Sequence, residues 1–293
     1  MLLYRLKKSE RKSSAAILMA STPRLAPRVP APTSLGTSIN RMLLDFCFTA
    51  IMIVCASKIK EILFNFSCIV RAYLWDMNKM ACITGATSGF GRAIALLLAE
   101  NNWDLCICGR RAYDLKEVSS LCEAKGVKVW SKVVDVRVES EVIQFVADMR
   151  SHFPQIEVLV NNAGLAVGRD AIQNGITDDW DRMMDTNVKG LLWMSREVSR
   201  WMIEHKQGTI VNIGSIAGKE VYDNGNVYCG TKFAVDALTK SMRLELAVHG
   251  VKVTGIHPGA VETEFSIVRF DGDEQRAQKV YEGFDNLIAE DIA

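Results

Sequence analysis

From residue 80 onward, short apolar runs alternate with longer segments in which apolar residues recur with a helical period. The apolar runs are rich in β-branched residues and predict strands at residues 80–83, 104–108, 127–134, 156–160, 209–213 and 251–256. The helical periodicity predicts helices at residues 92–101, 139–152, 187–205 and 228–249. This alternation predicts an α/β fold with a parallel sheet covered by helices on both faces.

The N-terminal part of the chain departs from this pattern. Residues 1–41 contain eight Lys or Arg and a single acid, Glu10, which predicts a disordered segment or an organellar transit peptide. The apolar run 42–57 offers a signal anchor, although it is shorter than the about 20 residues of a membrane helix and includes Asp45. The alternative is an upstream segment without function, with Met77 or Met80 as the better start. We therefore separate an extension, residues 1–76, from a domain at residues 77–293.

Composition and charge exclude several classes of function. The chain has 293 residues, with 35 Lys+Arg against 34 Asp+Glu and a net charge of +1, so no basic field is present to collect nucleic acid. The eight Cys form no C-x-x-C pair and the four His have no ligand spacing, which argues against a metal site and a disulfide scaffold. Free Cys in apolar runs behave as small hydrophobic residues. We expect a reducing compartment, the cytoplasm.

A glycine-rich turn follows the first predicted strand and directly precedes a predicted helix. Its sequence, Thr-Gly-Ala-Thr-Ser-Gly-Phe-Gly at residues 84–91, has the spacing G-x-x-x-G-x-G. Glycines allow a tight turn and close approach of a pyrophosphate, which then lies at the positive end of the helix. A merely structural turn is the alternative, but the position between strand and helix favours a dinucleotide.

The end of the second predicted strand indicates which dinucleotide binds. An acidic residue there would hold the 2′-hydroxyl of NAD, whereas this chain has Arg110 and Arg111. Guanidinium groups suit a 2′-phosphate, so the sequence favours NADP(H), unless both arginines only cap a solvent-exposed loop. Asp135 with Val136 and Asn162 with its neighbours follow the third and fourth strands, at the sheet edge where α/β proteins bind ligands.

Tyr228 and Lys232 are four residues apart at the start of a predicted helix and therefore share one of its faces. A nearby ammonium lowers the pKa of a phenol, which would let Tyr228 exchange a proton with a substrate. Ser215 lies thirteen residues upstream, after the fifth predicted strand, and supplies a hydroxyl at the same sheet edge. Asn187 begins a long predicted helix, where the alternative role is that of an N-cap.

Taken together, these motifs resemble those of the short-chain dehydrogenase/reductase family. The resemblance covers about residues 78–293, and segments such as 109–111, 185–190 and 263–270 look like NADP-dependent 3-hydroxy acid (serine) dehydrogenases. It implies a single Rossmann-like doubly wound domain, usually a homotetramer. It also implies an enzyme that oxidises β-hydroxy acids, such as serine or allo-threonine, or reduces the corresponding carbonyl compounds.

The resemblance also assigns roles to individual residues. Tyr228 is the general acid/base, Lys232 tunes it and contacts the nicotinamide ribose, Ser215 holds the substrate oxygen, and Asn187 supports a proton relay. The cofactor would be bound by the glycine-rich turn, the arginines and the ends of the later strands: Gly85, Thr87, Ser88, Gly89, Phe90, Gly91, Arg110, Arg111, Asp135, Val136, Asn162, Ala163, Gly164, Pro258, Gly259, Val261 and Thr263.

A β-hydroxy acid has a carboxylate that the enzyme must hold. Arg269 is the basic residue of the segment after Pro258 and Gly259, so it is the candidate for this contact. Its alternative is a surface arginine paired with Asp271 or Glu264.

The chain departs from the family pattern at both ends. It stops where the family continues with a last helix and strand, so we expect an incomplete sheet with an unpaired edge. Two other functions stay open: a truncated, catalytically weak NADP-binding protein, and a membrane-anchored carbonyl or lipid reductase that would depend on residues 42–57.

Overall fold

A computed structural model describes residues 79–270, 272–283 and 286–293. The predictions for residues 1–76, including the run 42–57, lie outside the described residues. The described strands form one parallel sheet in the order β3-β2-β1-β4-β5-β6. Strand β1 pairs with both β2 and β4, and the chain therefore extends the sheet first to one side and then to the other. The predicted doubly wound Rossmann-like fold is confirmed.

The strands lie where the apolar pattern placed them, with ends that differ by a few residues. Their bounds are β1 (Met80–Thr84), β2 (Asp104–Gly109), β3 (Val129–Val133), β4 (Val158–Asn161), β5 (Gly208–Ile213) and β6 (Val251–Ile256). The first two strands are buried along their whole length, as expected for strands covered on both faces. Strand β3 is the exception, because it lies at the sheet edge and has no fully buried residue.

The helices include several that the sequence pattern missed. Their bounds are α3 (Gly89–Glu100), α4 (Ala112–Glu123), α5 (Glu139–His152), α6 (Thr177–Met184), α7 (Leu191–Glu204), α8 (Asn226–Ala247), α9 (Phe265–Arg269) and α10 (Glu274–Lys279). A π-helical turn, η2 (Asp185–Gly190), joins α6 to α7. The helix predicted to begin at Asn187 therefore extends a helical segment that starts ten residues earlier, at Thr177.

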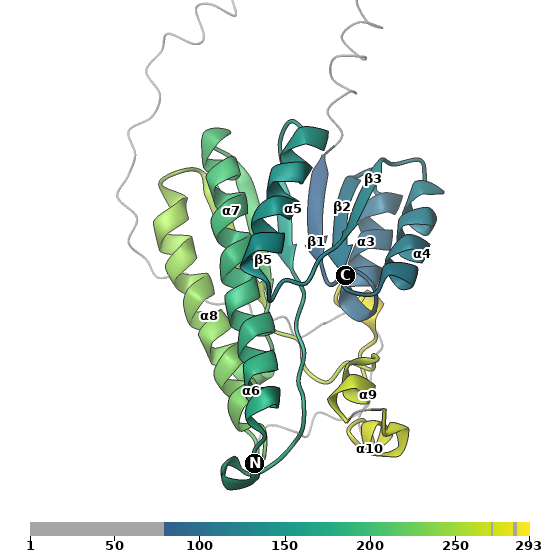
Figure 1. Cartoon of the computed structure of the whole chain (residues 1–293), viewed down its shortest axis with the longest axis vertical. Coiled ribbons are helices and arrows are strands. Elements are labelled where there is room, and N and C mark those ends of the chain that lie inside the picture. The colour runs from purple at the N-terminus through teal and green to yellow at the C-terminus, as the bar shows by residue number, and fades with distance from the viewer. Residues whose placement is uncertain (1–78, 271, 284–285) are drawn as a thin grey trace, which may run out of the picture. The chain divides into compact units, whose positions relative to one another are not determined.

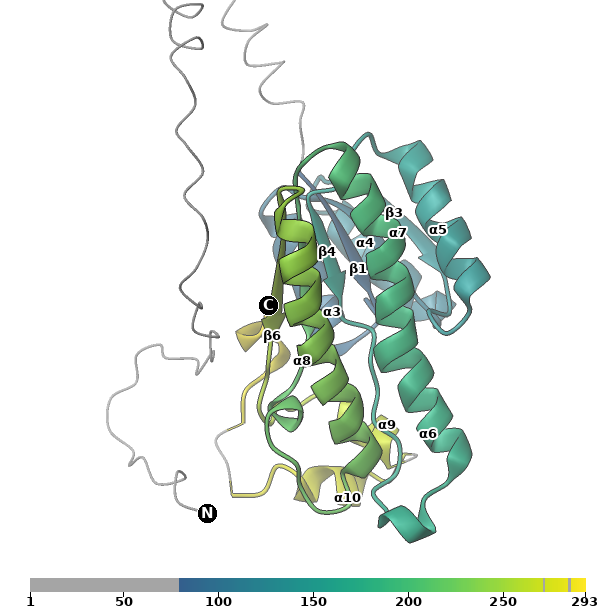
Figure 2. The ribbon, with the colours of Figure 1, turned by 90° about the vertical axis from the view of Figure 1, so that its left-hand side faces the viewer.

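Two apolar layers hold the helices onto the sheet. Cys82 of β1 faces the layer that includes α5 and α7, where Phe145 and Trp201 are buried. Its neighbour Ile83 faces the opposite layer, formed with α3 and α4. This alternation follows from the period of two along a strand, which directs successive side chains to opposite faces. Figures 1 and 2 show the helices on both sides of the sheet.

Four of the described cysteines belong to these two layers, and Cys229 lies in a separate apolar cluster with Tyr228. Cys82, Cys106, Cys108, Cys122 and Cys229 are all buried, as expected for cysteines that behave as small hydrophobic residues, and none forms a disulfide within the described residues. Burial raises the pKa of the Cys122 thiol to about 11, so it stays protonated near neutral pH.

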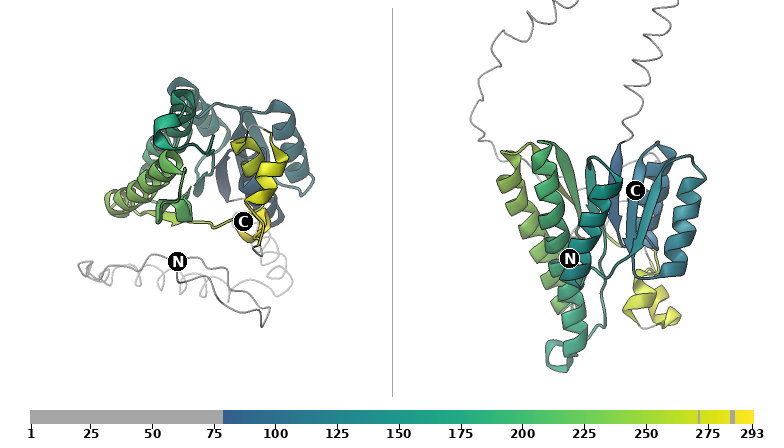
Figure 3. Two further views of the ribbon diagram at one scale, coloured as in Figure 1. Left: turned by 90° about the horizontal axis from the view of Figure 1, so that it is seen from below. Right: turned by 45° about the horizontal axis from the view of Figure 1, so that its top comes forward.

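The carboxyl ends of the strands share one edge of the sheet, and the segment after β6 crosses that edge. This segment carries α9 and α10, drawn in yellow beyond the lower end of the strands in Figures 1 and 3. It is attached to the rest of the domain through η4 (Ala289–Asp291), which packs against α3. Among the helices described, none has the length and apolar character needed to cross a membrane.

Candidate active site

A cleft of about 770 Å³ opens at the carboxyl ends of the strands. Of the predicted site residues, these line it: Gly85, Thr87, Ser88, Gly89, Phe90, Arg110, Arg111, Asp135, Val136, Asn162, Ala163, Gly164, Ser215, Tyr228, Lys232, Pro258, Gly259, Val261, Thr263 and Arg269. Gly91 and Asn187 are absent from this lining. One cleft thus brings together residues from both halves of the domain.

The glycine-rich turn is shaped by contacts that leave no room for side chains. Gly85 has a φ of +66°, in the left-handed region that favours glycine. A Cβ added to Gly91 would lie 2.3 Å from the carbonyl oxygen of Gly85, so the turn folds back on the first residues of α3. The backbone at the start of α3 therefore faces the cleft directly, as a bound phosphate requires.

Asn162 holds this turn in place. Its side-chain nitrogen donates hydrogen bonds to the carbonyl oxygens of Thr84 (2.9 Å) and Gly85 (3.0 Å). The Thr84 hydroxyl in turn accepts from the backbone nitrogen atoms of Asn162 and Ala163. The side-chain donors of Asn162 are thus used within the protein, and its predicted contact with the ribose stays a prediction.

The two arginines after β2 have different surroundings. Arg111 donates to the Thr87 hydroxyl and forms ion pairs with Asp114 (2.9 Å) and Glu264 (3.2 Å). Arg110 is exposed at the cleft and has no ion pair with any residue the structure describes. Arg110 is therefore the arginine whose charge is available to a phosphate, and Arg111 would have to exchange partners.

Asp135 lies on the same side of the cleft, after the neighbouring strand β3, where the charge of Arg110 acts on it. Burial would raise the pKa of its carboxyl, but hydrogen bonds from Arg137 outweigh this and hold the pKa below its ordinary value. Asp135 is thus an ionised, paired carboxylate.

Tyr228 and Lys232 lie together in the cleft, on the first two turns of α8. Both are buried, and the Lys232 ammonium is 5.9 Å from the centroid of the Tyr228 ring. Burial lowers the pKa of Lys232 to about 8. Burial also raises the pKa of Tyr228 well above its ordinary value, while a hydrogen bond with Ser215 and the charge of Arg269 act in the opposite direction. The pair is therefore a neutral phenol beside an ammonium that can lose its proton near neutrality.

Ser215 begins a short turn immediately after β5. Its side-chain oxygen accepts a hydrogen bond of 3.1 Å from the backbone nitrogen of Ala217, which caps η3 (Ile216–Gly218). The Lys232 ammonium donates to the carbonyl of Ile213, two residues before Ser215. The hydroxyl of Ser215 and the phenol of Tyr228 are thereby held at the same place in the cleft.

Asn187 is not the N-cap of a helix, which was the alternative role considered from the sequence. It lies inside the π-helical turn η2 and is 2% exposed. Its amide group exchanges two hydrogen bonds of 2.8 Å with the backbone of Leu165 and donates to the Thr231 hydroxyl. The extra residue in a π turn directs this side chain inward, a feature that helical periodicity does not reveal.

Arg269, at the end of α9, is buried rather than exposed. It donates to the hydroxyl of Tyr222 (2.8 Å) and to the carbonyl of Gly168 (3.2 Å), and its guanidinium carbon lies 5.7 Å from the Tyr228 ring. Glu264, offered as its partner, pairs with Arg111 instead. The alternative of an arginine at the protein surface is therefore wrong, and Asp271 lies outside the described residues.

Tyr222 and Phe265 also line the cleft, although no sequence motif marked them. Tyr222 orients Arg269 through its hydroxyl, and Phe265 packs on the Tyr228 ring with a centroid distance of 5.7 Å. Tyr222 lies in a loop and Phe265 begins the short helix α9, and neither segment shows a sequence periodicity that predicts its position.

The comparisons with known proteins agree with this geometry. The family model for short chain dehydrogenases matches residues 79–273. The chain belongs to this family. It is 42% identical over 211 residues to the NADP-dependent 3-hydroxy acid dehydrogenase YdfG of Salmonella typhi, covering 72% of this chain and 84% of that protein. It is 40% identical over 218 residues to sulfoacetaldehyde reductase 2 of Chromohalobacter salexigens, covering 74% and 86% of the two chains.

Among solved structures, the closed form of serine dehydrogenase complexed with NADP+ aligns with a TM-score of 0.69 and 38% sequence identity. The alignment covers 73% of this chain and 85% of that one. The predicted family membership is confirmed, and the names of these short-chain dehydrogenases agree with the prediction of an NADP-dependent oxidoreductase.

Proposed function

We propose that this short-chain dehydrogenase transfers a hydride between NADP(H) and the hydroxyl-bearing carbon of a small β-hydroxy acid, or the corresponding carbonyl carbon. The observation that carries the acid part of the proposal is Arg269. Its guanidinium is buried in the cleft, 5.7 Å from the Tyr228 ring, and has no carboxylate partner among the described residues. A buried cation without a counter-ion is costly, so an anion bound beside Tyr228 would stabilise it.

NADP(H) fits the walls of the cleft. The backbone of Gly85 to Gly89 would face the pyrophosphate, and the exposed guanidinium of Arg110 would pair with the 2′-phosphate. Pro258 and Gly259 would border the nicotinamide, close to Tyr228. When bound, the nicotinamide supplies the hydride donor or acceptor of the reaction.

Tyr228, Lys232 and Ser215 would handle the proton. During reduction, the phenol of Tyr228 donates its proton to the oxygen of the carbonyl group, and during oxidation it takes the proton back. The ammonium of Lys232 stabilises the phenolate that results, and the Ser215 hydroxyl orients the substrate oxygen. The side chain of Asn187 does not line the cleft and bonds to the backbone of Leu165, which does, and to the Thr231 hydroxyl, so we assign it a positioning role behind Tyr228 and Lys232.

The relatives' substrates support an acidic substrate. The names 3-hydroxy acid dehydrogenase and sulfoacetaldehyde reductase both specify a small molecule with an anionic group, one a carboxylate and the other a sulfonate. A guanidinium can bind either group through two parallel hydrogen bonds. Arg269 would thus bind the anionic group of the substrate, and the substrate's short carbon chain would place its hydroxyl group at Tyr228. We further propose a cytoplasmic homotetramer.

An NADPH-absorbance assay tests the function. The full chain, and a version that starts at Met77, are assayed with serine, allo-threonine, 3-hydroxyisobutyrate, sulfoacetaldehyde and uncharged aldehydes of matched length. We expect turnover with NADP(H) and higher kcat/KM for the acids. Tight NADPH binding without turnover on any substrate would instead support a catalytically weak NADP-binding protein, and equal rates with uncharged aldehydes would contradict the role of Arg269.

A further inference from the structure

His257 occupies a closely fitted space behind the active site. It follows β6 and directly precedes Pro258, and its side chain is 8% exposed. Two glycines make room for the ring. A Cβ added to Gly214 would lie 2.4 Å from its Nδ1, and one added to Gly255 would lie 3.0 Å from its Nε2. The imidazole is therefore held in one orientation.

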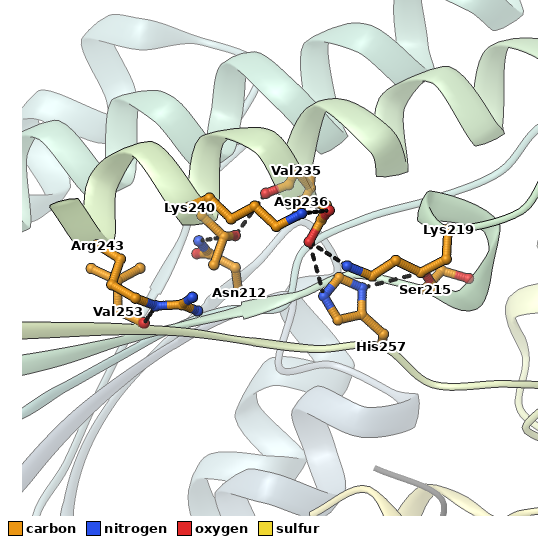
Figure 4. Close-up of polar contacts among 10 residues, drawn as sticks. Asn212, Ser215, Lys219, Val235, Asp236, Lys240, Arg243, Val253 and His257 are labelled. Carbon is orange, nitrogen blue, oxygen red and sulfur yellow. Dashed lines mark hydrogen bonds and ion pairs between the residues drawn. The ribbon is translucent and has the colours of Figure 1, made fainter. Parts of the chain in front are cut away.

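Both ring nitrogen atoms face hydrogen-bond acceptors (Figure 4). Nδ1 is 3.3 Å from the carbonyl oxygen of Ser215, and Nε2 is 3.5 Å from a carboxylate oxygen of Asp236. The same carboxylate accepts from the ammonium groups of Lys219 (2.6 Å) and Lys240 (2.7 Å). His257 thus joins the backbone of the Ser215 turn to a charged cluster on α8.

This cluster connects the three segments that carry the proposed chemistry. Lys219 ends the turn that Ser215 caps, and Asp236 lies one helical turn after Lys232 on α8. His257 begins the loop that borders the proposed nicotinamide site. None of these three side chains lines the cleft, so they act on the site only through the backbone that they hold.

A neutral imidazole cannot satisfy both acceptors. It has one N–H group, so one nitrogen lone pair must face either the Ser215 carbonyl or the Asp236 carboxylate, whereas an imidazolium donates to both. Burial and the positive charges of Lys219 and Lys232 lower the pKa of His257, while the Ser215 carbonyl and Asp236 act in the opposite direction. At neutral pH the ring is therefore uncharged, and it can donate a hydrogen bond to the Ser215 carbonyl or to the Asp236 carboxylate, but not to both.

We propose that His257 is a positioning residue, and that its protonation on acidification fixes the Ser215 turn against α8. The effect on catalysis rests on the proposed function, because it requires that Ser215 orient a substrate oxygen beside Tyr228. Acidification would then speed carbonyl reduction by placing the serine hydroxyl more firmly. In this proposal, carbonyl reduction requires Tyr228 to be protonated and is faster when His257 is also protonated.

Two variants separate the titration of the ring from its packing. His257→Asn keeps a donor near the position of Nδ1, and His257→Gln keeps one near Nε2, but neither side chain titrates. For wild type we expect kcat of reduction to rise by about threefold as pH falls through the His257 midpoint, with the KM for NADPH unchanged. Both variants should lose this inflection, while the exposed control His249→Asn keeps it.

A spectroscopic measurement on the ligand-free protein is independent of turnover. The chain has four His, so 13C-labelled histidine spectra identify the His257 signal by its loss in His257→Asn. We expect a midpoint below the ordinary value of a histidine, because burial lowers the pKa of His257, and a titration of the Ala217 methyl signal at the same pH. Asp236→Asn should lower the midpoint and Lys219→Met should raise it, because the first removes a favourable charge and the second an unfavourable one.

The outcomes decide between the two proposals. An Ala217 signal that does not follow the His257 midpoint, or a kcat inflection that persists in both His257 variants, would overturn the positioning role. If Ala217 follows His257 but no substrate is turned over, the positioning contact is supported and the proposed function fails.

Discussion

The guanidinium of Arg111 lies 3.2 Å from the carboxylate of Glu264, across the mouth of the cleft. Arg111 follows β2, whereas Glu264 immediately precedes α9, so the pair connects the proposed 2′-phosphate side of the cleft to the segment after β6. A 2′-phosphate would compete with Glu264 for this arginine.

Replacing Glu264 by Gln should therefore strengthen NADP(H) binding and leave NAD(H) binding unchanged. Exposed ion pairs are worth about 0.2–1 kcal/mol, which corresponds to a gain of about 1.4- to fivefold in affinity. Fluorescence titration with NADPH and NADH measures both. The neighbouring Glu262→Gln serves as control, and an equal gain there would show that Arg111 is not involved.

Tyr228→Phe should reduce kcat by about 10²–10⁴ while the Kd for NADPH stays within a small factor of wild type. The change removes one hydroxyl and little contact area. Stopped-flow turnover and fluorescence titration give the two quantities, and a fall in affinity as large as the fall in rate would contradict the proton-transfer role.

Arg269→Leu should raise the KM for hydroxy acids by about ten- to hundredfold, the value of a charge-assisted hydrogen bond. The KM for uncharged aldehydes should not change, because they have no acid group. Arg269→Lys keeps the charge but loses the fork, so an intermediate KM is expected. Melting temperatures and NADPH binding show whether the loss of contacts to Tyr222 and Gly168 has unfolded the site; a uniform loss on both substrate types would refute acid binding.

Lys232→Met should increase the free energy of unfolding at pH 7 and abolish turnover. The pKa of Lys232 falls from 10.5 to about 8 on folding, so the folded protein holds fewer protons than the unfolded chain between these values. The buried ammonium costs about 3 kcal/mol below pH 8, and this cost disappears as the pH rises to 10.5. Urea denaturation of both proteins at pH 7 and 10.5 should thus show the advantage of the variant shrinking; an advantage that is constant or grows would disagree.

Gly91→Ala and Gly230→Ala form a matched pair of helical substitutions. The first places a methyl group 2.3 Å from the Gly85 carbonyl oxygen, whereas the second meets nothing within 4 Å. Gly91→Ala should displace the glycine-rich turn and weaken NADPH binding at least tenfold, and Gly230→Ala should stabilise α8 by about 0.5–1 kcal/mol with normal binding. Thermal unfolding and NADPH titration of the two variants test this, and similar effects at both glycines would count against the contact.

Several features of this protein could be predicted from the sequence because they depend on neighbours in the chain. The buried runs that became β1 and β2 carry their own periodicity, and the turn at residues 84–91 carries its glycines. The spacing of Tyr228 and Lys232 places both on one face of any helix that contains them. Their location at a common sheet edge then follows from the parallel order of the strands.

Tertiary structure decided the features that depend on partners distant in sequence. Arg269 is compatible with a surface position by its sequence, but in the fold it bonds to Gly168 and Tyr222. Arg111 pairs with Glu264, which lies 153 residues later in the chain. Asn187 turns inward only because a π turn joins α6 to α7. The two acceptors on His257 come from separate segments, and burial by the packed fold sets its protonation. Local periodicity records which face of an element is buried, but the identity of a partner and the electrostatic environment depend on how those faces are packed together.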